Sequence, residues 1–107
     1  MKLHEIAHAR SGDKGNTSDI SVFAFDSLGY ARLERELTPD RVRAHFGPIV
    51  RGEITRFCLP NLHAIKFVLQ DALAGGVTKS LALDAHGKCL SSVLLEMEIP
   101  ESLETGR

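Results

Sequence analysis

The sequence predicts an α+β fold, with a single small sheet and two main helices packed on one face of it. The first observation is the order of the patterns: two strands, a helical segment, a strand, a helix, and one or two final strands. The second is that the chain has no repeats and no linker, so all of these elements share one core. One sheet with helices on one side accounts for both observations.

Length and composition fit a single soluble domain. The chain has 107 residues, of which 43% are hydrophobic and 25% charged, with a net charge of −1. We therefore expect one domain over residues 1–107, with 100–107 as a frayed tail. Near-zero charge argues against nucleic acid and anionic membranes, and no run of about 18 apolar residues could span a bilayer. The N-terminus lacks a signal core, so a cytoplasmic protein with free thiols at Cys58 and Cys89 is expected.

Three segments have the pattern of strands. Apolar and polar side chains alternate over residues 2–9, which predicts a first strand. Residues 19–25 are apolar on both faces and predict a central strand that helices cover on at least one side. Residues 50–59 have the composition of a third strand.

Two helical segments are predicted between the second and third strands. The apolar spacing over residues 27–37 is close to helical, although Gly29 weakens the first turn. A better helix starts after Thr38, which can cap it, and ends at Gly47.

The second main helix is predicted over residues 62–74. Its apolar residues form one broad stripe at helical spacing, Asn61 can cap it, and Gly75-Gly76 end it. Phe67 falls outside the stripe, on the polar side. That position suits either a protein–protein contact or the edge of the core.

The last segments are predicted to be a strand at 78–84, a turn at 85–88 and a final strand at 96–100. Residues 89–97 fit two structures equally well. They either extend the final strand or form a short helix, and the sequence leaves both open.

The polar segment 10–19 is the main candidate for a functional site, and it is interpreted as a loop between two strands. Gly12 and Gly15 let successive N–H groups converge on an anion, and Arg10 and Lys14 add positive charge. The alternative is a plain hydrogen-bonded connection. The predicted ligand-binding residues are Arg10, Ser11, Gly12, Asp13, Lys14, Gly15 and Asn16, and the candidates for catalysis are Asp13 and Lys14.

The remaining polar residues give no metal site. His4 and His8 would share a strand face but lie ~13 Å apart, which is too far for one ion. Arg51 and Arg56 are expected on opposite faces of the third strand, solvated or in salt bridges, with an anion contact as the alternative. The other histidines are expected on helices or in a turn: His45, His63 and His86.

Five segments of the chain resemble the AtuA-like ferredoxin-fold domain: "ARSGDKGNTSDISVFA", "LTPDRVRAHF", "LPNLHAIKFVL", "ALAGGVTKSLALDAHGK" and "LLEMEIP". This domain occurs at the C-terminal end of acyclic terpene utilisation protein A and as a separate short protein. The resemblance covers roughly residues 6–100 and implies a ferredoxin-like fold. The positions that match the family's motifs are residues 10–16, Asn61, Gly75-Gly76, Asp84 and Gly87-Lys88.

The resemblance also implies a metabolic setting and a partner. The family is associated with catabolism of acyclic terpenes and branched acids through acyl-CoA thioesters. A separately encoded large subunit is therefore one expected partner, and a homo-oligomer is the other. The leading hypothesis is an accessory or binding subunit, with no cofactor expected. The alternatives are a structural oligomerisation module and a small acyl-CoA enzyme that uses Asp13 or His8 as base and Lys14 as electrostatic stabiliser.

Overall fold

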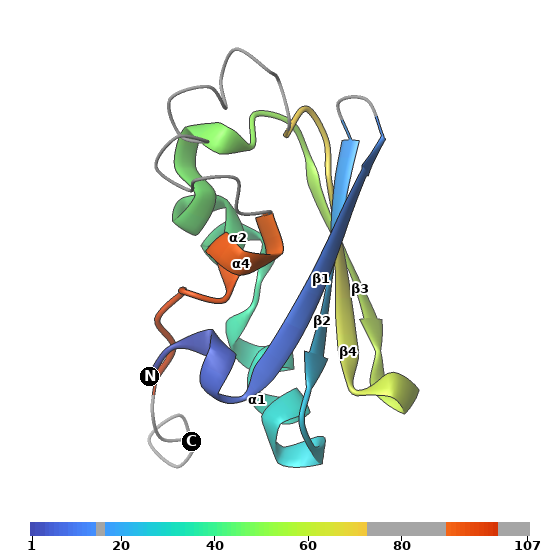
Figure 1. Cartoon of the computed structure of the whole chain (residues 1–107), viewed down its shortest axis with the longest axis vertical. Coiled ribbons are helices and arrows are strands. Elements are labelled where there is room, and N and C mark those ends of the chain that lie inside the picture. Colours follow the sequence, from blue (N-terminus) through green and yellow to red (C-terminus); the bar gives the residue numbers. More distant parts are fainter. Residues whose placement is uncertain (15–16, 73–89, 101–107) are drawn as a thin grey trace.

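A computed structural model describes residues 1–14, 17–72 and 90–100, and its fold is α+β (Figure 1). A four-stranded antiparallel sheet has the order β1-β2-β4-β3. This architecture confirms the predicted class and is consistent with a ferredoxin-like fold. The strands are β1 (Ala7–Lys14), β2 (Thr17–Ala24), β3 (Ile54–Leu59) and β4 (Ala64–Leu69).

The α-helices of the described residues lie on one face of the sheet (Figure 1). They are α1 (Ser27–Glu36), α2 (Pro39–Phe46) and the short α4 (Leu90–Leu94). The Thr38 hydroxyl accepts the Arg41 N–H at 3.2 Å, as the sequence predicts for the cap of α2. Gly47, with φ of 59°, then ends α2. None of the helices in the described part of the chain is long and apolar enough to cross a membrane.

Glycine suits position 29, because the first turn of α1 packs closely against Ile6 and Ala24. A β carbon at position 29 would lie 3.3 Å from the Ile6 carbonyl oxygen and 3.4 Å from the Ala24 β carbon. The Asp26 carboxylate also accepts the Gly29 N–H at 2.7 Å and caps the helix. Capping and close packing therefore offset the low helix propensity of glycine.

The core lies between the helices and the face of the sheet that they cover. Side chains from β2 and β4 alternate into it, because successive residues of a strand point to opposite faces. Burying each of these side chains contributes about 1.5–3 kcal/mol. The fully buried members from strands and helices are Ile20, Val22, Ile65, Phe67, Leu69, Leu33, Leu37, Val42 and Leu94.

The predicted helix over 62–74 is wrong, because residues 64–69 form β4. This strand pairs with β2 on one side and with β3 on the other, so its backbone groups are satisfied by neighbouring strands. Phe67 is fully buried in the core, not on a polar flank. Asn61 belongs to a 3₁₀ turn, Pro60–Leu62, instead of capping a helix, and Gly75-Gly76 lie outside the described residues.

The chain ends also differ from the prediction. Leu3–Glu5 form a 3₁₀ turn, and the first strand starts only at Ala7. The Leu3 N–H donates to the Met97 carbonyl at 2.9 Å, so the N-terminal segment pairs with the last described segment. The final strand predicted at 96–100 is reduced to one bridge between Lys2 and Glu98.

For residues 89–97, the helical alternative is the one observed, as α4. The strand predicted at 78–84, the turn at 85–88 and Cys89 lie outside the described residues, as does the tail beyond residue 100. Cys58 is a half-buried free thiol, as predicted.

Candidate functional site on the uncovered sheet face

The second face of the sheet points away from α1, α2 and α4, and none of the described helices or strands covers it (Figure 1). The strand register arranges its side chains in three rows that run across all four strands. The first row is His8, Phe23, Ala64 and Leu59; the second is Arg10, Ser21, Lys66 and Phe57; the third is Gly12, Asp19, Val68 and Thr55.

The first row is aromatic and apolar. The His8 ring stacks on Phe23 with centroids 5.2 Å apart and on Phe25 with centroids 6.0 Å apart. Leu59 is the β3 member of the same row. These contacts give the His8 ring a packing role on an exposed surface.

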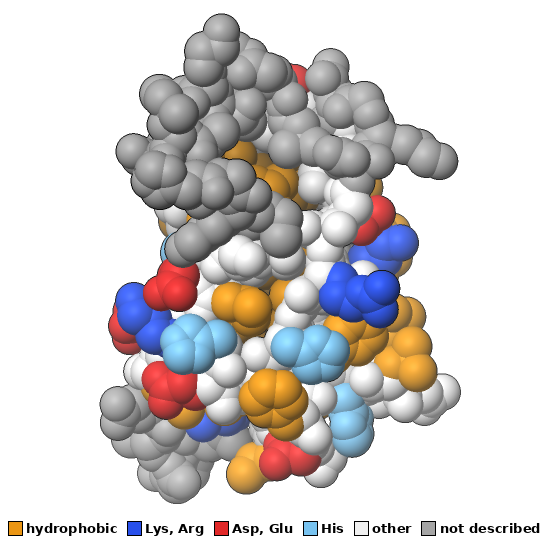
Figure 2. All heavy atoms as spheres, in the orientation of Figure 1, with side chains coloured by type: hydrophobic (Ala, Val, Ile, Leu, Met, Phe, Trp, Pro, Cys, Tyr) orange, Lys and Arg blue, Asp and Glu red, His pale blue; other side chains and the backbone are white. Residues whose placement is uncertain are grey.

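An exposed apolar patch continues from this row. Figure 2 shows hydrophobic side chains gathered on the side where the strands lie, beside Lys, Arg and His side chains. Exposed apolar side chains that gather on one side mark an interaction site more often than single exposed residues do. The members of the patch and their exposed fractions are Phe25 (61%), Phe57 (48%), Leu59 (39%) and Leu62 (62%).

The second row carries two cations. Arg10 lies opposite Ser21, and Ser21 lies opposite Lys66, so the hydroxyl stands between the two positive side chains. Within the described residues, neither Arg10 nor Lys66 forms an ion pair. Both side chains lie on the face of the sheet that the described helices leave uncovered, where a ligand or a partner could bind.

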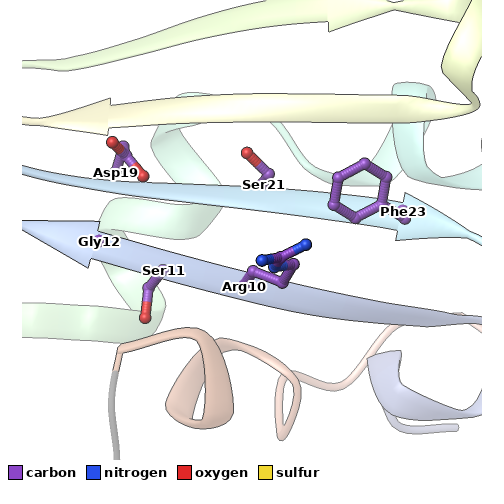
Figure 3. Close-up of a pocket in the computed structure, with 6 residues that line it drawn as sticks. All are labelled: Arg10, Ser11, Gly12, Asp19, Ser21 and Phe23. Atoms are coloured by element: carbon purple, nitrogen blue, oxygen red, sulfur yellow. The ribbon is translucent and has the colours of Figure 1, made fainter.

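A pocket of about 280 Å³ opens between β1 and β2, lined by Arg10, Ser11, Gly12, Asp19, Ser21 and Phe23 (Figure 3). Arg10 and Ser21 occupy paired positions of the second row, while the Ser11 side chain points the other way, toward α4 (Figure 3). There the Ser11 hydroxyl bonds to the Ser91 hydroxyl at 3.3 Å. The pocket therefore presents one cation, one carboxylate, a hydroxyl and an aromatic ring.

The predicted loop is largely strand, because β1 extends to Lys14 and pairs with β2 along its whole length. Arg10, Ser11 and Gly12 line the pocket. Asp13 and Lys14 occupy the last two positions of β1, and Gly15 and Asn16 lie outside the described residues. The binding role of the segment 10–16 and the catalytic role of Asp13 and Lys14 stay predictions.

Sequence reasoning did not select Ser21, Phe23 or Lys66 for the site. The alternation of β2 places Asp19, Ser21 and Phe23 on one face, and this signal was readable from the sequence. Lys66 had no such signal, because its position depends on the pairing of β4 with β2.

Other polar residues have structural roles. His45, on α2 as predicted, places its Nε2 2.8 Å from the Val93 carbonyl oxygen. His63 follows a 3₁₀ turn in a left-handed conformation and not a helix. Arg56 donates to backbone carbonyls of Glu34 and Leu37. The described part of the chain holds no group of three or more His, Cys, Asp and Glu that could bind a metal.

Fold and surface together define a small α+β domain in which the described helices cover only one face of the sheet. The chain matches the model of the AtuA ferredoxin-like domain over residues 1–100 and belongs to that family. This match confirms the resemblance seen in the sequence. No curated protein and no solved structure matches the chain.

Proposed function

We propose that the chain is an accessory, binding subunit of a larger AtuA-type protein that acts in the cytoplasm, in catabolism of acyclic terpenoid or branched acyl-CoA compounds. One observation carries the proposal: the exposed apolar patch on an uncovered sheet face. Family membership supports the AtuA-related context. The subunit would dock the larger protein through this patch.

The energetics of the patch favour a protein partner. Burying apolar surface stabilises an association by roughly 25 cal/mol per Å², and aromatic anchors at the centre of an interface carry much of the binding energy. On β3, Phe57 belongs to the row that carries the two cations, and Leu59 belongs to the neighbouring row. A partner with a complementary apolar centre and an acidic rim fits this surface best.

The segment Arg10–Asn16 contributes to the proposal as an anion-binding or interface site. Arg10 is exposed beside the pocket and has no ion-pair partner within the described residues. Lys14 would add a second positive charge at the end of β1, with Asp13 and Asn16 orienting the bound group. Covering the face with a partner would strengthen each of these contacts by excluding water.

The test is native mass spectrometry of the tagged protein purified gently from its own host, alongside the double variant Phe57→Ser, Leu59→Ser. A stoichiometric complex with a larger protein is expected for the wild type and is expected to disappear for the double variant. Leu28→Ser is the matched control, because Leu28 is 63% exposed but lies on α1. A complex that survives the double variant, or no complex at all, overturns the proposal.

A homo-oligomerisation module is the second candidate. The observation that favours it is the pair of edge strands, β1 and β3: no other strand of the described residues pairs with their outer sides, where another copy could pair. A homo-oligomer of the wild type, without a larger protein, would support this candidate. Loop variants at Asp13 and Lys14 would then change stability and nothing else.

A further inference from the structure

We infer that Arg10, Ser21 and Lys66 bind the head group of a small amphipathic carboxylate, whose apolar part lies against Phe23. This inference deepens the proposed binding role and rests on it for its biological use, because it names the chemical class of the ligand. Its chemistry is independent of the partner protein. The inference is based on the register of β1, β2 and β4 and on the pocket between β1 and β2.

The register brings the three polar side chains to one spot. Arg10, Ser21 and Lys66 are directly opposite one another on three neighbouring strands. Neighbouring strands lie about 4.8 Å apart, so the backbones of Arg10 and Lys66 are about 10 Å apart. Both side chains are long enough to converge on a group that sits over the Ser21 hydroxyl, which can donate a further hydrogen bond.

The net charge of the site matches that of a singly charged anion. Arg10 and Lys66 contribute two positive charges, and Asp19, in the next row and on the pocket wall, contributes one negative charge. Within the described residues none of the three forms an ion pair. The sum over these three groups is one positive charge, which a carboxylate neutralises, whereas a doubly charged phosphate would leave one negative charge unbalanced.

The other end of the pocket is apolar. Phe23 forms its wall beyond Ser21, and the His8 ring stacks on Phe23 at 5.2 Å and extends this surface. A ligand with its carboxylate over Ser21 can therefore lay a hydrocarbon part along Phe23 toward the His8 ring. The volume of about 280 Å³ is close to the lower limit of roughly 300 Å³ for ligand pockets, so the ligand is small.

The test is an NMR titration of the whole chain with octanoate, compared with 1-octanol and with inorganic phosphate. Octanoate is expected to shift the backbone amide signals of Arg10, Ser21, Phe23 and Lys66 in a saturable way. Its affinity is expected to exceed that of either comparison compound by about tenfold or more. Octanol tests the apolar part without the charge, and phosphate tests the charge without the apolar part.

Two variants localise the binding. Arg10→Gln and Lys66→Gln are each expected to weaken octanoate binding by about fivefold or more, while the folded spectrum persists, because both side chains lie on the uncovered face. Arg32→Gln is the matched control: it removes the same charge from α1, on the helix side of the sheet, and is expected to leave octanoate binding unchanged.

Each other outcome overturns the inference. If octanol binds as tightly as octanoate, the site does not recognise the carboxylate. If phosphate binds as tightly as octanoate, the site does not recognise the apolar part. If octanoate leaves the spectra unchanged, it does not bind. The double variant Phe57→Ser, Leu59→Ser separates this inference from the proposed partner. This variant is expected to lose its complex with the larger protein but to bind octanoate as the wild type does. The two experiments therefore test the partner and the ligand separately.

Discussion

Gly52 lies against the backbone of Gln70 at the far end of the β3–β4 pair. The Gly52 N–H donates to the Gln70 carbonyl at 3.0 Å, and the Gln70 N–H donates to the Glu53 carbonyl at 2.9 Å. A β carbon at position 52 would fall 2.7 Å from the Gln70 carbonyl oxygen and 2.9 Å from the Gln70 β carbon. Only glycine permits this approach, which continues the pairing of β3 with β4 past their last ladder residues.

Gly52→Ala is therefore expected to destabilise the protein by about 1–3 kcal/mol, because backbone atoms must move to admit the new methyl group. Urea unfolding followed by circular dichroism measures the change. Gly12→Ala is the control, since a β carbon there would meet only the Asp19 carboxylate, at 3.5 Å. Equal stabilities of the two variants would contradict the close approach at Gly52.

The strand around Phe67 could not be predicted from the sequence alone. Residues 62–74 fit a helical stripe, but Ile65, Phe67 and Leu69 also alternate, which suits a strand with one buried face. Residues 64–69, which form β4, are too few for periodicity to distinguish a strand from a helix. The strand is favoured by pairing with β2 and β3, which are distant in sequence and contribute no local signal.

Phe67→Ala is expected to cost about 3–5 kcal/mol, because Phe67 is fully buried and its removal leaves a cavity. The free energy of unfolding in urea measures this cost. Phe57→Ala is the control: Phe57 lies on the other face and is 48% exposed, so the change should cost less than about 1 kcal/mol. If Phe67 lay on an exposed helix flank, the two variants would be equally stable.

The polar segment after Ala9 was only partly predictable. Its composition correctly indicated a surface, since Arg10 and Gly12 are exposed. Its glycine, aspartate and asparagine residues are common in turns, so the sequence predicts a loop there. The structure instead extends β1 to Lys14, since the strand pairs with the strongly apolar β2 throughout. Pairing with β2 therefore keeps the end of β1 in a strand, although the sequence of that end favours a turn.

Arg56 connects β3 to the end of α1, and this role differs from the solvated or salt-bridged one that its sequence position indicated. Its guanidinium donates to the Glu34 carbonyl at 2.9 Å and to the Leu37 carbonyl at 3.0 Å. Positive charge at a helix C-terminus is favourable, so Arg56→Gln should cost about 1–2 kcal/mol in urea unfolding. Arg51→Gln, at an exposed side chain, is the control and should cost little.

Tyr30 predicts how stability depends on alkaline pH. Its hydroxyl is buried, and burial, then Cys58 and Glu34, raise its pKa above the ordinary 10.0. Above pH 10.0 the unfolded chain loses this proton first, so stability falls as pH rises toward the folded pKa. Tyr30→Phe should lessen that fall, because phenylalanine has no proton to lose. Tyr30 is the only tyrosine, so phenolate absorbance of the folded protein measures its pKa directly, and a midpoint at or below 10.0 contradicts the prediction.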